Sequence, residues 1–460
     1  MDDNKRNMLA TAPVNKLLIK FAVPSIIAML VSALYNIVDQ FFIGRSIGTL
    51  GNAATNIVFP LSTSCVALSL LLGIGGASTF NLAMGAGKKE DGAYYIGNAA
   101  TLLISSGIIL CIIVQLFTRP LLLFFGAPDD VMPYAVPYTY ITSFGFPFLI
   151  FATGGGHLIR ADGSPKYAML CNLTGAAINT ILDPLLIFVF NMGMAGAAIA
   201  TIIGQICSGI LVILYIRKYK TVKLKIEHLK VRLKYTRKII SLGASPFINQ
   251  IAMMVTQIVM NKSLTYYGAL SQYGESIPLA CSGIITKVNM LFFAIIIGIS
   301  QGLQPIVSFN YGAEKYDRVK SSYILASKIA FLISIIAFLV FQFAPRQIIS
   351  LFGRGSEMYF EFATSYFRIF LFFTFLNFVQ PITSNFFTAI GKPLKGILLS
   401  LTRQIIFLLP LIIIFPLYIG IDGVMYAGPV ADFMAAATGI VLVYFELKNL
   451  GVPKKAGMAI

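Results

Sequence analysis

Apolar segments long enough to cross a bilayer recur along almost the whole chain. A membrane-spanning α-helix needs about 20 predominantly apolar residues. Twelve segments meet this requirement: 17–43, 52–84, 93–117, 133–158, 167–190, 193–216, 238–268, 278–310, 320–343, 358–389, 395–417 and 420–445. Only 12% of the residues are charged, about half the share in soluble proteins. Since lipid offers the backbone no hydrogen-bond partners, we expect an all-α polytopic membrane protein with twelve transmembrane helices.

The lysines and arginines are concentrated in alternate loops. If the N-terminus lies in the cytoplasm, the cytoplasmic segments hold 25 of the 35 basic residues and the opposite loops hold four. Basic loops remain on the cytoplasmic side of a membrane. We therefore expect a multi-pass protein of the cytoplasmic (inner) membrane with both termini in the cytoplasm. The net charge of +17 then faces anionic membrane lipid, and we expect no nucleic-acid partner.

The most basic stretch is the expected boundary between two domains. We expect an N-terminal lobe at 1–216, a cytoplasmic linker at 217–237 and a C-terminal lobe at 238–460, with six spans in each lobe. Apolar residues alternate with the charges of the linker: Leu224, Ile226, Leu229, Val231 and Leu233. This pattern suits a chain that lies on the inner leaflet, and it also suits a solvated linker.

The two halves of the chain resemble each other. Gly73–Gly87 aligns without gaps to Gly298–Gly312, and Ala161–Pro165 aligns to Ala389–Pro393. Because six spans separate equivalent points, both halves insert with the same orientation, which is a parallel repeat about an axis along the membrane normal. The cleft between two such lobes is the expected path of a ligand.

The fifth span carries an acidic residue near its middle. Asp183 follows Asn179 by one helical turn, so both side chains lie on one face. Pro184 cannot donate a backbone hydrogen bond, which leaves the carbonyl of Thr180 without its helical partner. An ionised aspartate at the centre of a membrane helix costs about 2.5–3.5 kcal/mol on insertion scales. We therefore expect this residue to serve a function.

The first span carries a second acidic residue. Tyr35, Asn36 and Asp39 share one helical face, because they are spaced by three and four residues. Pro24 lies about four turns earlier and allows the helix to bend.

One lobe thus offers a set of polar groups for a cation. Asp39, Asn179, Asp183 and Thr201 come from three spans, and Gln205 lies one turn after Thr201. Oxygen ligands of this kind suit Na⁺. A desolvated pair of carboxylates also suits a proton, because two close charges away from water cannot both ionise at low cost. A structural hydrogen bond in a packed bundle is the alternative.

The acidic pair is not repeated in the second half. Asp39 aligns to Asn261, and Asp183 aligns to Leu411 or its neighbour. Four other charged residues lie in or near the second-half spans: Lys262, Lys287, Arg403 and Asp432. They either pair within the lobe, Arg403 with Asp432 being one candidate, or line the ligand path.

An enzymatic function is not expected. Two membrane aspartates could form the dyad of an intramembrane protease, but the Y-D and G-x-G-D motifs of such enzymes are absent, since Val38 precedes Asp39 and Leu182 precedes Asp183. The sequence has no P-loop motif for ATP. The five cysteines lie in apolar spans, and two separated histidines do not make a metal site. We expect no cofactor and no metal, apart from Na⁺ at the aspartates.

Together these motifs resemble the MATE (multidrug and toxic compound extrusion) transporters, in particular the MepA-like branch near the DinF group. The resemblance covers all twelve spans. It rests on Pro24 with Tyr35-Asn-Ile-Val-Asp39, Arg160-Ala-Asp-Gly-Ser-Pro-Lys166, Asn179-x-x-x-Asp183-Pro184, Thr201, and Ala389-Ile-Gly-Lys-Pro393 followed by Arg403-Gln404. The family implies two six-helix lobes around a V-shaped cleft. In related members the residues that match Asp39, Asn179, Asp183 and Thr201 form the cation site.

The resemblance also implies a function. Members of the family export cationic, amphipathic drugs by antiport with H⁺ or Na⁺, which confers antibiotic resistance, and we expect a monomer. The C-terminal acids used by the NorM branch are missing here, which argues against a cation site in that lobe. A lipid-linked precursor flippase of the same superfamily is the alternative. Such flippases tend to carry several arginines in the cleft, and the apolar N-terminal lobe offers none.

Overall fold

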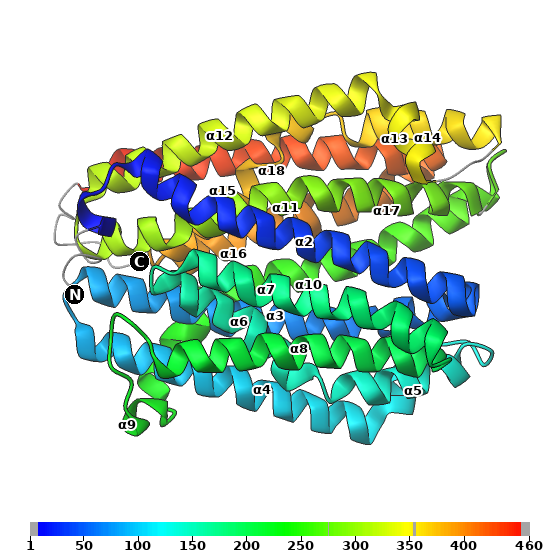
Figure 1. Ribbon diagram of the computed structural model, residues 1–460. Coiled ribbons are helices and arrows are strands. Elements are labelled where there is room, and N and C mark those ends of the chain that lie inside the picture. Colours follow the sequence, from blue (N-terminus) through cyan, green and yellow to red (C-terminus); the bar gives the residue numbers. More distant parts are fainter. Residues whose placement is uncertain (1–7, 275, 353–355, 452–460) are drawn as a thin grey trace.

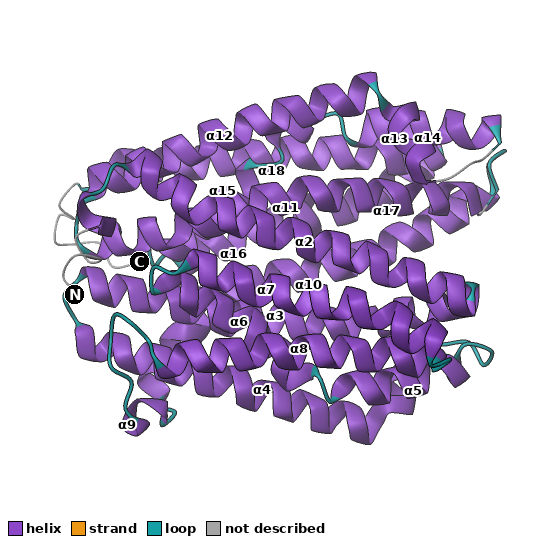
Figure 2. Cartoon of the chain, in the orientation of Figure 1, coloured by secondary structure: helices purple, strands orange, loops and turns teal. Residues whose placement is uncertain are grey.

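Helices make up the whole of the regular structure that is described. The computed structural model describes residues 8–274, 276–352 and 356–451, and this part of the chain contains no strand (Figure 2). The helices that form the bundle are α2 (Val14–Ile47), α3 (Thr49–Gly85), α4 (Lys89–Phe124), α5 (Met132–Ser143), α6 (Phe146–Ala161), α7 (Pro165–Pro184), α8 (Gly193–Arg217), α10 (Leu233–Ala269), α11 (Ser276–Gly312), α12 (Tyr316–Phe343), α14 (Glu357–Phe370), α15 (Val379–Ala389), α16 (Pro393–Leu401), α17 (Leu409–Ile419) and α18 (Ile421–Asn449). Two short helices lie outside the spans, α9 (Ile226–Leu229) and α13 (Pro345–Phe352).

The expected number of spans is confirmed for the described residues. Eleven helical segments are long and apolar enough to cross a membrane, and α5 and α6 form a twelfth span that is bent by 57° at their junction. Helices α14 and α15 are joined by a short 3-10 helix, Thr374–Leu376, and together cross once.

Two spans contain π-helical segments that the sequence did not predict. The fifth span continues from α7 into a π-helix at Leu185–Val189, directly after Pro184. The eleventh span contains a π-helix at Thr402–Leu408, between α16 and α17, just before Pro410. A proline has no N–H and cannot continue the regular α-helical ladder. The wider π-helical turn next to each proline lets backbone carbonyl groups bond to N–H groups five residues later, so the span continues without a break.

Four helices join the two lobes in equivalent pairs. Helix α2 of the first lobe packs on α11 of the second, and α3 packs on α10 (Figure 1). Both contacts depend on glycine. A Cβ atom at Gly298 would lie 2.6 Å from the Cα of Ile26, and a Cβ atom at Gly243 would lie 1.7 Å from the carbonyl oxygen of Leu71. These contacts lie toward the end of the bundle where α2 begins and α18 ends, so the lobes meet backbone to backbone at that end.

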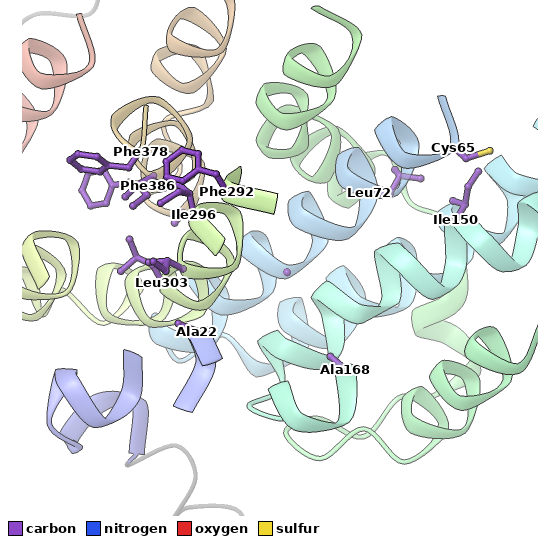
Figure 3. Close-up of a cluster of buried hydrophobic side chains, with 14 of the residues drawn as sticks. Ala22, Cys65, Leu72, Ile150, Ala168, Phe292, Ile296, Leu303, Phe378 and Phe386 are labelled. Carbon is purple, nitrogen blue, oxygen red and sulfur yellow. The ribbon is translucent and has the colours of Figure 1, made fainter. Parts of the chain in front are cut away.

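Buried apolar side chains fill both lobes. Figure 3 shows Phe292, Phe378 and Phe386 gathered in one group, and Leu72 and Ile150 in another; all five are buried. The five cysteines are free thiols, and three of them, Cys65, Cys171 and Cys281, are fully buried. The cysteines therefore act as small apolar residues in the packing.

Candidate cation site

Asn179 links α7 to α8 inside the first lobe. Its Nδ2 atom donates to Oδ1 of Asp183 and to Oγ1 of Thr201, at 3.3 Å in each case. Asp183 is completely buried, Asn179 is 2% exposed and Thr201 is 9% exposed. The i, i+4 spacing of Asn179 and Asp183 on one helix places the two side chains together.

Two glycines allow these helices to approach closely. A Cβ atom at Gly204 would lie 2.7 Å from the carbonyl oxygen of Gly175. Gly175 precedes Asn179 by one turn, and Gly204 follows Thr201 by almost one turn. The close backbone packing of α7 on α8 thus brings the amide within reach of the hydroxyl.

Helix α2 completes the site from the other side. It packs on α7, and the carboxyl groups of Asp39 and Asp183 lie close enough to interact with each other. One turn before Asp39, the side chain of Tyr35 lies next to that of Thr201. Two carboxyl groups this close and away from water cannot both ionise at low cost. The structure therefore brings together Asp39, Asp183, Asn179, Thr201 and Tyr35.

Several oxygen atoms in this cluster have no protein partner. Oδ1 of Asp39, Oδ2 of Asp183 and Oδ1 of Asn179 are buried and make no hydrogen bond. Buried oxygens without a partner are costly, and a small hard cation or a proton would satisfy them. The residues present therefore fit either H⁺ or Na⁺ as the bound ion.

The other predicted residues lie around the cluster rather than in it. The amide of Asn36 donates to the carbonyl oxygen of Ser32 on its own helix. Gln205 of α8 extends its side chain to the junction of α5 and α6, where a Cβ atom at Gly145 would be 2.1 Å from its Oε1 atom. Pro24 lies inside the continuous helix α2, about 22 Å along its axis from Asp39.

The backbone next to Asp183 also belongs to the surroundings of the site. Pro184 ends α7 and begins the passage into the π-helix. Because Pro184 has no N–H, the carbonyl of Thr180 lacks the usual i+4 donor. Thr180 itself is half-buried on α7.

Sequence reasoning missed Tyr138 of α5. Its hydroxyl group interacts electrostatically with Asp39, Asp183 and Tyr35. The sequence around it is rich in tyrosine, with Tyr134 and Tyr140 on the same helix. Nothing in the spacing singles out Tyr138, because the side of α5 that faces the carboxyl groups depends on how this helix packs on its neighbours.

The charges of the second lobe form a separate pair. Nε of Arg403 lies 2.6 Å from Oδ1 of Asp432, and both side chains are largely buried. The expected pairing within the lobe is confirmed. Lys262 is exposed on α10 and Lys287 is half-exposed on α11, and neither forms an ion pair with a described carboxylate.

Comparison with known proteins places this architecture in a family. The MatE family model matches residues 24–185 and again residues 247–414, one match in each lobe. The chain belongs to the MatE family. The two matches also support the parallel repeat, since each lobe carries one copy of the family's sequence pattern.

Individual relatives extend over the full chain. The multidrug export protein MepA of Staphylococcus haemolyticus is 25% identical, with 99% of this chain and 98% of that protein aligned. A MOP superfamily transporter from Pyrococcus furiosus has the same fold, with a TM-score of 0.90, 22% identity and coverage of 97% and 98%. An outward-facing multidrug resistance MATE family transporter has a TM-score of 0.90 at 24% identity, with coverage of 98% of each chain.

Proposed function

We propose that this protein exports cationic, amphipathic drugs from the cell by secondary antiport, in exchange for H⁺ or Na⁺ bound between Asp39 and Asp183. Membership of the MatE family and the full-length similarity to a multidrug export protein support the substrate class. The observation that carries the site assignment is the cluster of buried carboxyl and amide oxygens without protein partners. The lipid-linked flippase alternative has no comparable support.

The position of α2 suggests how ion binding is coupled to drug movement. Helix α2 packs on α11 of the other lobe with the part around Ile26, and it packs on α7 with the part around Asp39. Neutralising the carboxyl pair changes the electrostatic repulsion between α2 and α7. A shift of α2 would then act on the lobe interface, with Pro24 lying in the part of the helix that bends most easily. Because the drug and the ion bind at different stages of the cycle, export of the drug is coupled to import of the ion.

We favour the proton as the coupling ion. A proton shared between Asp39 and Asp183 needs only the two carboxyl groups, whereas Na⁺ needs every ligand placed at about 2.4 Å. The proximity of the two carboxyl groups supports this choice, because close carboxylates away from water ionise together only at high cost. We also propose that the two lobes, 1–216 and 238–460, move relative to each other and are joined by a cytoplasmic linker at 217–237. Both termini face the cytoplasm, and the transporter acts as a monomer.

Transport by purified protein in liposomes tests the proposal. A pH gradient and a Na⁺ gradient are imposed independently, and efflux of a fluorescent organic cation is followed. We expect efflux driven by the pH gradient alone and lost in Asp183→Asn, while Asp130→Asn in an exposed loop leaves it unchanged. Efflux by Asp183→Asn at the normal rate would remove this residue from the coupling site.

A further inference from the structure

The connection between the two lobes exposes apolar side chains. Ile226 and Leu233 are each 82% exposed, Val231 is 51% exposed and Leu229 is 41% exposed. Exposed lysines and arginines alternate with them along residues 223–238: Lys223, Lys225, Lys230, Arg232, Lys234, Arg237 and Lys238. An apolar face bordered by basic residues is the composition of a segment that lies in a membrane interface.

This segment is fixed in place by hydrogen bonds to α4. Nδ2 of Asn98 donates to the carbonyl oxygens of His228 and Lys230, each at 3.1 Å, and Oδ1 of Asn98 accepts from the backbone N–H of Arg232 at 2.7 Å. Oγ1 of Thr101 donates to the carbonyl oxygen of Leu229 at 2.9 Å. The main chain therefore faces α4, and the apolar side chains point away from it into the surroundings.

Close packing supports the same arrangement. A Cβ atom at Gly97 would lie 2.2 Å from the carbonyl oxygen of His228, so only glycine allows this approach. The guanidinium group of Arg232 lies 4.2 Å from the ring centre of Tyr94. Asp162 holds the beginning of the connection, accepting backbone hydrogen bonds from Lys220 and Thr221 at 2.8 and 2.9 Å.

Glu90 of α4 lies beside Glu227 and His228 of the segment, and both ring nitrogens of His228 are engaged in hydrogen bonds. Nδ1 of His228 accepts from the backbone N–H of Lys225 at 3.0 Å, and Nε2 lies 3.1 Å from Oε1 of Glu90. In the neutral ring Nε2 therefore carries the proton and donates to Glu90. The hydrogen bond from His228 to Glu90 is therefore one more link between the segment and α4.

The depth of the segment matches the edge of the lipid-facing surface. The residues of α4 that bind it end at Thr101, and the next residues on α4 include the exposed Ile104, Ile108 and Ile112. Ile104 lies about 4.5 Å along the helix axis from Thr101. Figure 1 shows α9 on the side of the bundle next to α4, toward the end where the chain begins. The apolar side chains of the segment thus continue the apolar surface of α4 at its border.

We propose that residues 223–233 form a membrane-surface anchor for anionic phospholipid. Ile226 and Leu233 insert at the boundary between headgroups and acyl chains, and Lys223, Lys225 and Lys230 contact lipid phosphates, with Lys225 exchanging its exposed ion pair to Glu227 at 3.2 Å for a phosphate. The anchor is attached to the first lobe through α4 and leads directly into α10 of the second lobe. The leaflet therefore holds the connection between the lobes at a fixed depth.

Tryptophan fluorescence tests this proposal, because the chain contains no tryptophan. Ile226→Trp introduces a single reporter, and Lys88→Trp in the exposed α3–α4 loop is the matched control. Both variants are placed in nanodiscs with brominated lipids, either phosphatidylcholine alone or with phosphatidylglycerol. In the anionic nanodiscs we expect quenching of Ile226→Trp to exceed that of Lys88→Trp by at least about two-fold, with emission at shorter wavelength.

Two further variants separate the parts of the proposal. Replacing Lys223, Lys225 and Lys230 by glutamine in the Ile226→Trp background should remove the extra quenching that phosphatidylglycerol produces. Asn98→Ala should release the segment and reduce quenching in both lipids, with the elution profile reporting on folding. Equal quenching of Ile226→Trp and Lys88→Trp would overturn the anchor. Quenching that is the same in neutral and anionic lipid would overturn the role of the phosphate contacts.

Discussion

Asn179 donates one hydrogen bond to Asp183 and another to Thr201, both at 3.3 Å and both inside the first lobe. Its amide nitrogen thus fixes the carboxyl group of α7 relative to the hydroxyl group of α8. Its own Oδ1 atom is buried and makes no hydrogen bond. Asn179 therefore orients Asp183, and in the proposed mechanism its free Oδ1 atom is available as a ligand for the ion.

Asn179→Ala should weaken ion binding without abolishing it. The variant removes one unpartnered oxygen and frees Asp183 from its donor, but the carboxyl pair remains. We expect a clear rise in the proton or Na⁺ concentration that gives half-maximal efflux, with little change in maximal rate. Asn36→Ala is the matched control, since the Asn36 amide bonds only to Ser32 among the described contacts. An equal effect of both variants would contradict the role of Asn179.

Tyr138→Phe should alter the dependence of efflux on pH. The substitution removes a hydroxyl group that interacts electrostatically with Asp39 and Asp183 while keeping the ring. Tyr140→Phe, on the same helix but 49% exposed, is the control. Efflux rates measured across a series of external pH values should shift for Tyr138→Phe and coincide with the wild type for Tyr140→Phe. Identical profiles for all three proteins would exclude Tyr138 from the site.

Arg403→Gln should destabilise the second lobe. The change leaves Asp432 buried without its partner, which costs about 3–5 kcal/mol. Thermal unfolding can be followed with a thiol-reactive dye, since three of the cysteines are fully buried. The double variant Arg403→Met, Asp432→Leu should recover most of the loss, because it removes both charges together. A double variant as unstable as Arg403→Gln would contradict this account.

Gly243→Ala should destabilise the contact between the lobes. Its Cβ atom would lie 1.7 Å from the carbonyl oxygen of Leu71, so α3 and α10 must separate, at a cost of about 1–3 kcal/mol. Gly283→Ala on α11 is the control, because its Cβ atom would meet nothing within 4 Å. We expect slower transport and a lower unfolding temperature for the first variant only. Equal stability of the two variants would show that this contact tolerates separation.

The spans and the pairing of Asn179 with Asp183 could be predicted because both depend on local spacing, whereas the resemblance to a known family suggested that Asp39 and Thr201 join them. Hydropathy locates the helices, and the i, i+4 rule places Asp183 beside Asn179. Three features depend on tertiary structure and were not predictable. They are the bend between Ser143 and Phe146, the orientation of Tyr138 toward the carboxyl groups, and the extension of the Gln205 side chain toward Gly145. The sequence also left two interpretations of the 217–237 linker, because the hydrogen bonds from Asn98 come from a distant helix.

Infrared difference spectroscopy of the carboxyl groups tests the central claim most directly. Spectra of the reconstituted protein are recorded as the pH is lowered, with and without Na⁺, for the wild type, Asp39→Asn, Asp183→Asn and the control Asp130→Asn. We predict a C=O stretching band of a buried protonated carboxyl group in the wild type and in Asp130→Asn, and its loss or displacement in both site variants. A band that is unchanged in Asp39→Asn and in Asp183→Asn would contradict ion binding between these two residues.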